Sequence, residues 1–141
     1  MAILIGIDTG TDTGLAVWDT ATKKLLECTT LKLHIALWKV KDLADTYGSI
    51  AVYFEDARLR KWIPQDPSYS RMKGRLQGAG SVKRDSKIWE DFCKDLGVEY
   101  HAIAPKDNMT KVSEDLFKAI THWEGRTSEH ARDAAFLVIN R

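Results

Sequence analysis

The stretch that decides the fold lies near the amino terminus and reads Ile3-Leu-Ile-Gly-Ile-Asp8-Thr-Gly-Thr-Asp-Thr-Gly14-Leu-Ala-Val-Trp18. An apolar run enters a turn rich in glycine and threonine and then resumes, which is the pattern of a β-hairpin. Gly10 and Gly14 can adopt backbone angles closed to other residues, so the turn can fold tightly and let an anion approach the main chain. The hairpin therefore presents one carboxylate, Asp8, at the end of a strand.

An aspartate in such a turn is, taken alone, usually an Asx-type residue whose side chain bonds its own backbone. Two further acids favour a functional interpretation, because both lie at the ends of predicted elements. Glu55 follows the apolar run 50–54, and Asp133 lies in the first turns of the last predicted helix. Each also has a simpler explanation, as a solvated strand-end acid or as a partner of the helix dipole.

Length and composition predict one globular domain, residues 1–141, large enough to bury a core. The chain is 44% hydrophobic and 29% charged, as globular proteins are. It contains neither an apolar run of about 18 residues nor a signal-peptide pattern, so we expect a cytoplasmic protein without a membrane span. Cys28 and Cys93 lack zinc or CxxC spacing, so neither a disulfide framework nor a zinc site is supported.

The alternation of apolar and polar residues predicts an α/β domain. Its expected strands cover residues 2–8, 14–19, 24–32, 50–54 and 98–104, and its expected helices cover 34–47, a stretch ending at Gly97, 113–121 and 127–138. The first three strands form an antiparallel meander, and the other two are parallel strands reached through helices. The prediction is a mixed five-stranded sheet flanked by helices.

The net charge of +1 conceals a basic segment from Arg58 to Lys87, which contains nine basic residues and two acidic ones. Its first part, residues 58–69, contains two prolines and is expected to be a loop, while residues 74–81 are rich in small side chains and suit close packing or a dimer contact. Cations alternating with aromatic residues suit a surface that binds phosphates and stacks unpaired bases. A solvated face, a dimer contact or a cover for the core are the alternatives. The predicted nucleic-acid contacts are Arg58, Arg60, Lys61, Trp62, Tyr69, Arg71, Lys73, Arg75, Lys83 and Arg84.

The acids converge on one edge of the predicted sheet. Asp8 and Glu55 end strands that we expect to be parallel, and parallel strands have their carboxyl ends on one edge. His130 and Asp133 are three residues apart and share one helix face. Carboxylates with one imidazole and no cysteine favour Mg²⁺ or Mn²⁺, and two such ions about 4 Å apart can hydrolyse a phosphodiester. This order of acids fits a ribonuclease-H-like fold.

Five motifs together resemble the RuvC family of Holliday-junction resolvases, in a short phage-type form. They are Gly6-Ile-Asp-Thr-Gly10, Phe54-Glu55, residues 74–80 before a helix, residues 100–105 followed by Lys111, and His130-Ala-Arg-Asp133-Ala. The resemblance implies a homodimer that nicks four-way DNA junctions symmetrically with Mg²⁺, with Mn²⁺ as a substitute, in a bacterial or phage-infected cell.

The resemblance also implies roles for individual residues. Asp8 bridges the two ions, Glu55 and Asp133 each hold one or both, and His130 completes the ligand set. Lys111 falls where the family has a basic residue near the scissile phosphate. The segment 58–71 corresponds to the junction-probing region but is longer, which leaves cleavage-sequence preference and strict four-way selectivity open.

Three other functions are compatible with parts of the sequence. A less selective nuclease for branched or flap DNA would use the same scaffold, and a non-catalytic subunit would only bind the junction. The motif Asp8-Thr-Gly-Thr-Asp-Thr-Gly14 also resembles the first phosphate loop of actin and sugar kinases. Those proteins need a second comparable domain, for which 141 residues leave no room.

Overall fold

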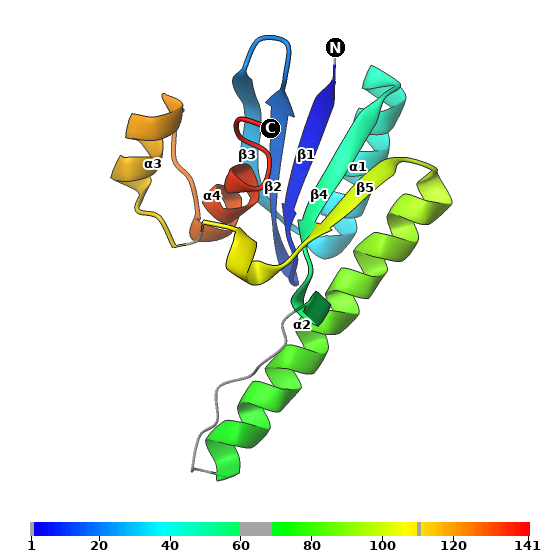
Figure 1. Cartoon of the computed structure of the whole chain (residues 1–141), viewed down its shortest axis with the longest axis vertical. Coiled ribbons are helices and arrows are strands. Elements are labelled where there is room, and N and C mark those ends of the chain that lie inside the picture. The colour runs from blue at the N-terminus through cyan, green and yellow to red at the C-terminus, as the bar shows by residue number, and fades with distance from the viewer. Residues whose placement is uncertain (1, 60–68, 110) are drawn as a thin grey trace.

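The computed structural model describes residues 2–59, 69–109 and 111–141. Its five-stranded sheet has the order β3-β2-β1-β4-β5. The strands are β1 (Ile3–Asp8), β2 (Asp12–Asp19), β3 (Lys24–Lys32), β4 (Ile50–Glu55) and β5 (Glu99–Ile103). The helices are α1 (Leu33–Tyr47), α2 (Tyr69–Leu96), α3 (Glu114–Thr121) and α4 (Glu129–Phe136), with short 3-10 turns η1 (Ala57–Leu59) and η2 (Pro105–Asp107) (Figure 1).

The predicted sheet is confirmed. β1, β2 and β3 form an antiparallel meander, whereas β4 is parallel to β1 and β5 is parallel to β4. Each parallel strand is reached through a helix, α1 before β4 and α2 before β5. Gly48 ends α1 with a positive φ of 76°, a conformation that glycine adopts without strain.

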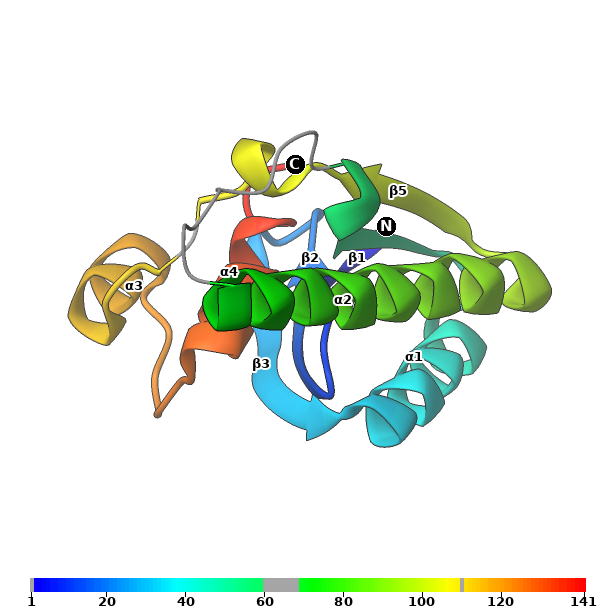
Figure 2. The same ribbon diagram turned by 90° about the horizontal axis from the view of Figure 1, so that it is seen from below.

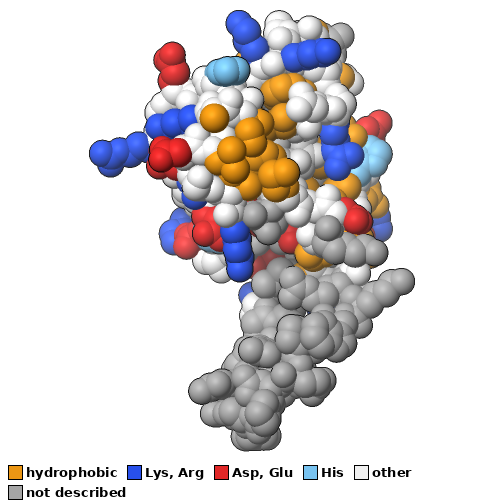
Figure 3. Space-filling model, turned by 60° about the vertical axis from the view of Figure 1, so that its left-hand side comes forward, with side chains coloured by type: hydrophobic (Ala, Val, Ile, Leu, Met, Phe, Trp, Pro, Cys, Tyr) orange, Lys and Arg blue, Asp and Glu red, His pale blue; other side chains and the backbone are white. Residues whose placement is uncertain are grey.

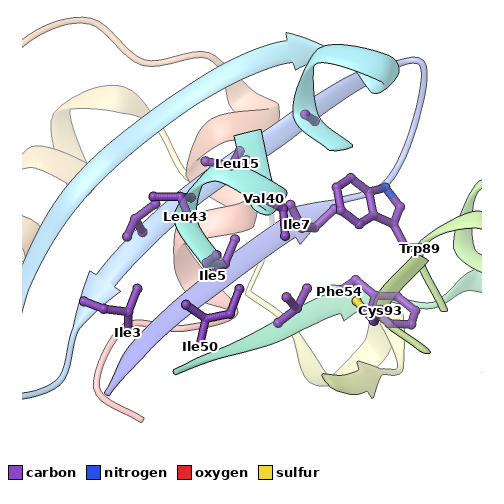
Figure 4. Close-up of a cluster of buried hydrophobic side chains, with 13 residues drawn as sticks. Ile3, Ile5, Ile7, Leu15, Val40, Leu43, Ile50, Phe54, Trp89 and Cys93 are labelled. Carbon is purple, nitrogen blue, oxygen red and sulfur yellow. The ribbon is translucent and has the colours of Figure 1, made fainter. Parts of the chain in front are cut away.

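The two faces of the sheet bury two different cores. Successive residues of a strand point to opposite faces, so Ile3, Ile5 and Ile7 of β1 pack on one side with Val40 of α1 and Trp89 of α2 (Figure 4). The even-numbered residues of β1 face α4, which lies on the other side of the strands from α1 (Figure 2). Asp8 has even parity and therefore faces α4.

The structure differs from the prediction at two helix ends. α2 already begins at Tyr69, so residues 74–81 lie inside the helix rather than before it. The arginine, lysine, methionine and glutamine residues around these glycines favour helix enough to continue it. The last helix spans Glu129–Phe136 and is shorter than the predicted 127–138, because the chain changes to a turn at Leu137.

Two further features concern the helices and the two cysteines. Within the described ranges, no helix is long and apolar enough to cross a membrane. Cys28 and Cys93 are free, buried and in different cores, and burial raises the pKa of each thiol to about 12.

Candidate active site at the carboxyl edge of the sheet

Asp8 and Glu55 lie side by side at the carboxyl edge of β1 and β4. Ile7 pairs with Phe54 in the parallel register, so Asp8 and Glu55 are the next residues of the two strands. Both side chains lie on the face of the sheet that packs against α4, because Asp8 alternates with Leu4 in β1 and Glu55 alternates with Ala51 in β4. The Thr9 hydroxyl donates a hydrogen bond to the backbone oxygen of Glu55 at 3.2 Å and joins the two strand ends just beyond the sheet.

Two glycines let α4 lie directly on the strands. A Cβ atom at Gly14 would lie 1.9 Å from the backbone oxygen of His130, and one at Gly6 would lie 2.1 Å from the backbone oxygen of Ala134. Real Cβ atoms do not approach other atoms below 3.0 Å, so any side chain at these positions would displace the helix. The close approach brings the first turns of α4 over the end of β1.

Ser128 fixes the beginning of α4. Its hydroxyl accepts a hydrogen bond from the Ala131 N–H at 3.1 Å, which caps the helix. The same hydroxyl is hydrogen-bonded to Thr30 of β3. The amino end of α4 is thus attached to the sheet, and His130 is carried to the candidate site.

His130 and Asp8 form the closest contact of the site. His130 Nδ1 lies 2.8 Å from Asp8 Oδ2, and 54% of the His130 side chain is exposed against 14% of that of Asp8. The pKa of Asp8 is raised to about 6, mainly by burial; the His130 hydrogen bond opposes the rise, and the charge of the neighbouring Asp133 contributes to it. The bond to Asp8 raises the pKa of His130.

Asp133 is buried beneath the connection that precedes α3. Its Oδ1 accepts a hydrogen bond from the Lys111 N–H at 3.0 Å, and its backbone oxygen accepts one from Asn108 Nδ2 at 3.1 Å. Burial raises the pKa of Asp133, and the charge of Glu129 adds to the rise. The hydrogen bond from its backbone N–H places Lys111 next to Asp133, and Lys111 is exposed to solvent.

The donor set fits a hard divalent cation by its chemistry. The charge of Asp133 contributes to the raised pKa of Asp8, and a cation bound between like charges relieves such repulsion. In the part of the chain that the structure describes, no group of three or more His, Cys, Asp or Glu side chains is already arranged to hold a metal ion. The four predicted ligands share one edge of the sheet, and His130 is bonded to Asp8 in this arrangement.

Comparison with known proteins identifies the fold. No family model and no curated protein sequence matches the chain. Among solved structures, the chain is similar to Thermus thermophilus RuvC in complex with Holliday junction substrate, with 17% identity, a TM-score of 0.56, and coverage of 97% of this chain and 90% of that one. A second Thermus thermophilus RuvC structure gives 18% identity, a TM-score of 0.54, and coverage of 96% and 90%. The chain has the RuvC fold. The resemblance predicted from its motifs is confirmed at the level of the fold.

Arg58, one of the predicted nucleic-acid contacts, is bound within the RuvC fold itself. Its Nη2 lies 2.7 Å from Asp56 Oδ2 and 2.8 Å from Glu90 Oε2, and its Nε lies 2.9 Å from Asp56 Oδ1. These bonds raise the pKa of Arg58 and hold that of Glu90 at about 2. The cluster ties η1 to α2, so the charge of Arg58 is neutralised by acids of its own chain.

The other predicted nucleic-acid contacts belong to α2 or precede it in the sequence. Lys83 and Arg84 are exposed on α2. Tyr69, Arg71, Lys73 and Arg75 belong to the backbone of α2, and their side chains lie outside the described residues, as do Arg60, Lys61 and Trp62 entirely. In Figure 1 the amino-terminal half of α2 extends past the carboxyl edge of the sheet, on the side of the molecule where the candidate site lies.

The surface of this chain also has a hollow away from these residues. A cavity of about 440 Å³ is lined mainly by β3 residues, with Ile35 and Lys39 of α1 and with Trp123. Figure 3 shows apolar side chains gathered on the side of the molecule that carries α3. None of the residues lining the cavity belongs to the predicted ligand set, so the cavity is not part of the candidate active site.

The sequence did not reveal three residues that build the site. Ser128 carries a local signal, because serine is a preferred residue before a helix. Asn108 and Arg132 carry none, because their partners depend on how the connection before α3 packs against α4. Arg132 lies inside the motif that provides His130 and Asp133, but its side chain donates hydrogen bonds to the backbone oxygens of Val112 and Thr127.

Proposed function

We propose that this protein is a metal-dependent endonuclease that cuts branched DNA, and that the four-way junction is its substrate. The observation that carries the proposal is the 2.8 Å contact between His130 and Asp8 at the carboxyl edge of the sheet, together with the raised pKa values of Asp8 and Asp133. The RuvC fold supports the choice of substrate, since a Thermus thermophilus RuvC of this fold has been solved with a Holliday junction.

Asp8, Glu55, His130 and Asp133 would hold Mg²⁺, for which Mn²⁺ would substitute. Bound divalent ions at such a site lower the pKa of a water molecule and stabilise the leaving oxygen of a phosphodiester. The other contributions come from the chain itself. Docking of α4 on Gly6 and Gly14 orients His130 and Asp133 toward the strand ends. The exposed ammonium group of Lys111 neutralises charge at the phosphate to be cut.

Phosphate contacts of the DNA arms would come from the basic segment, including the exposed Lys83 and Arg84 of α2. Such contacts position the substrate without reading its sequence. We further propose a homodimer, because paired cuts in a two-fold junction require two active sites related by the same symmetry.

The test uses a synthetic immobile four-way junction, a matched linear duplex and a flap, each with Mg²⁺, Mn²⁺ or EDTA. We expect paired symmetric nicks in the junction alone, lost in EDTA. Asp8→Asn should abolish nicking and leave junction binding intact. Asp12→Asn is the matched control, and it should retain nicking. Asp12 lies four residues after Asp8, and its exposed carboxylate pairs with Lys32 at the end of β3.

Each other outcome has a distinct meaning. Cleavage of all three substrates would retain the metal site and replace the junction resolvase by a less selective branched or flap nuclease. Tight junction binding without nicking would indicate a non-catalytic junction-binding subunit. Nicking by Asp8→Asn at the rate of the unmodified protein would contradict the assigned site.

A further inference from the structure

Arg132 binds two segments of the chain that meet at α4. Its Nε donates a hydrogen bond to the backbone oxygen of Val112 at 2.8 Å. Its Nη1 donates to the backbone oxygen and to the hydroxyl oxygen of Thr127, each at 3.0 Å. The guanidinium group therefore joins the residue that follows Lys111 to the residue that precedes the helix cap. Hydrogen bonds from a charged donor are roughly twice as strong as neutral ones.

Lys111 has a backbone conformation that needs such support. Its φ is 58°, in the left-handed region that residues with a side chain rarely adopt. Such residues persist only where the surrounding structure over-determines them, and they are frequent at active sites. The Lys111 N–H is held by Asp133, and the oxygen of the next residue is held by Arg132.

Other contacts hold residues on either side of Lys111. Asn108 donates to the backbone oxygen of Asp133, and the Thr127 N–H donates to Glu114 Oε1 of α3 at 3.3 Å. Val112 is buried in the core on the α4 side. Lys111 is thus held by Asp133 at its own N–H and by Arg132 at the oxygen of Val112. The same arginine also binds Thr127, just before the cap of α4.

We propose that Arg132 is a positioning residue that holds Lys111 in its left-handed conformation beside Asp133. Arg132 lies outside the ligand set and acts through the backbone of Lys111 and Val112. The catalytic part of this inference rests on the proposed function, since it takes Lys111 to act at the phosphate. The structural part does not, since the conformation of Lys111 can be measured in a protein that cuts nothing.

The first test measures amide hydrogen exchange of Lys111 by NMR in the unmodified protein, Arg132→Lys and Arg132→Gln. In Arg132→Gln we expect exchange at Lys111 to rise at least about tenfold while exchange at Val52 in β4 changes much less. Arg132→Lys, which keeps one charged donor, should give an intermediate rise. Arg126→Gln is the control, because Arg126 is an exposed arginine of the same connection. If Lys111 keeps its protection in the folded Arg132 variants, the proposal is wrong.

The second test is a double-mutant cycle on junction nicking with Lys111→Ala, Arg132→Gln and the double variant. We expect Arg132→Gln to lower kcat between about 10-fold and 100-fold with little change in KM, the scale of a misplaced catalytic group. The double variant should nick no more slowly than Lys111→Ala, because Arg132 then has no lysine to position. Effects that multiply would overturn the proposal. A protein that nicks no DNA would contradict the proposed function, and the exchange measurement would still decide the position of Lys111.

Discussion

Replacing Gly14 by alanine tests whether the candidate site depends on direct contact between α4 and the sheet. The added Cβ would lie 1.9 Å from the backbone oxygen of His130, and it needs at least 3.0 Å. The helix must therefore move away from β2 by about 1.1 Å. No side-chain rotation can relieve the clash, since the atom it meets belongs to the backbone.

The expected cost follows from that displacement. Overpacking a well-packed core typically costs about 1–3 kcal/mol, and a clash of a Cβ with a backbone oxygen, which cannot rotate away, belongs at the upper end of that range. A loss of about 3 kcal/mol in the free energy of unfolding would lower the Tm of a chain of this length by roughly 10 °C. The separation of His130 Nδ1 from Asp8 Oδ2, now 2.8 Å, would exceed hydrogen-bond length if α4 moves as a rigid body away from β1.

Urea unfolding followed by circular dichroism, together with the junction assay, measures both effects. Gly80→Ala is the matched control, because a Cβ at this position of α2 meets no atom within 4 Å. Alanine inside a helix should stabilise the control by about 0.5–1 kcal/mol relative to glycine, with nicking retained. The reasoning is refuted if Gly14→Ala unfolds within about 0.5 kcal/mol of the unmodified protein, the spread of neutral surface changes, and still nicks the junction.

Three further predictions concern strain, charge and burial. Lys111→Gly should raise the free energy of unfolding by up to about 1 kcal/mol, because glycine adopts positive φ without strain, and should slow nicking as much as Lys111→Ala does. Lys23→Gly, at a φ of 54° in another turn, should give the same stabilisation and keep nicking, as urea titration and the junction assay will show. Glu90→Gln should lower the free energy of unfolding by about 1 kcal/mol at neutral pH, because the pKa of Glu90 in the folded protein, about 2, lies below the ordinary 4.5. The difference in unfolding free energy between the two proteins should shrink as pH falls from about 4.5 toward 2 in acid titrations, and a constant difference would contradict the prediction. The thiols of Cys28 and Cys93, with pKa values raised to about 12, should react with a thiol reagent at pH 8 only after unfolding, and rapid labelling of the folded protein would contradict their burial.

Strand positions were predictable because the relevant signal is local. The residues of β1 on one face are all isoleucine, and the run of β4 is nearly all apolar. The predicted range 24–32 coincides with β3, and the predicted range 50–54 ends one residue before β4 does. The helix before β4 then required a parallel pairing, which predicts that Asp8 and Glu55 share one edge.

The parts that could not be predicted depend on contacts between distant residues. Asp8 and His130 are 122 positions apart, and only the docking of α4 defines the distance between them. The sequence predicts Arg58 as a DNA contact because it opens a basic segment, yet its partner Glu90 lies 32 positions further along the chain. The sequence predicts a later start for α2 than the observed Tyr69, because glycines have poor helix propensity when judged one by one.

The glycines of the first hairpin separate two interpretations of the same motif. A phosphate loop of the actin and sugar-kinase type requires the turn to present its main chain to an anion. At Gly14 the space above the backbone is filled by α4, whose His130 carbonyl oxygen lies closest to that glycine. A carbonyl oxygen repels a phosphate, and the acids Asp8 and Glu129 add negative charge to the same region. Gly14 therefore serves helix docking, and the negative charge around it favours the nuclease proposal over a phosphate loop.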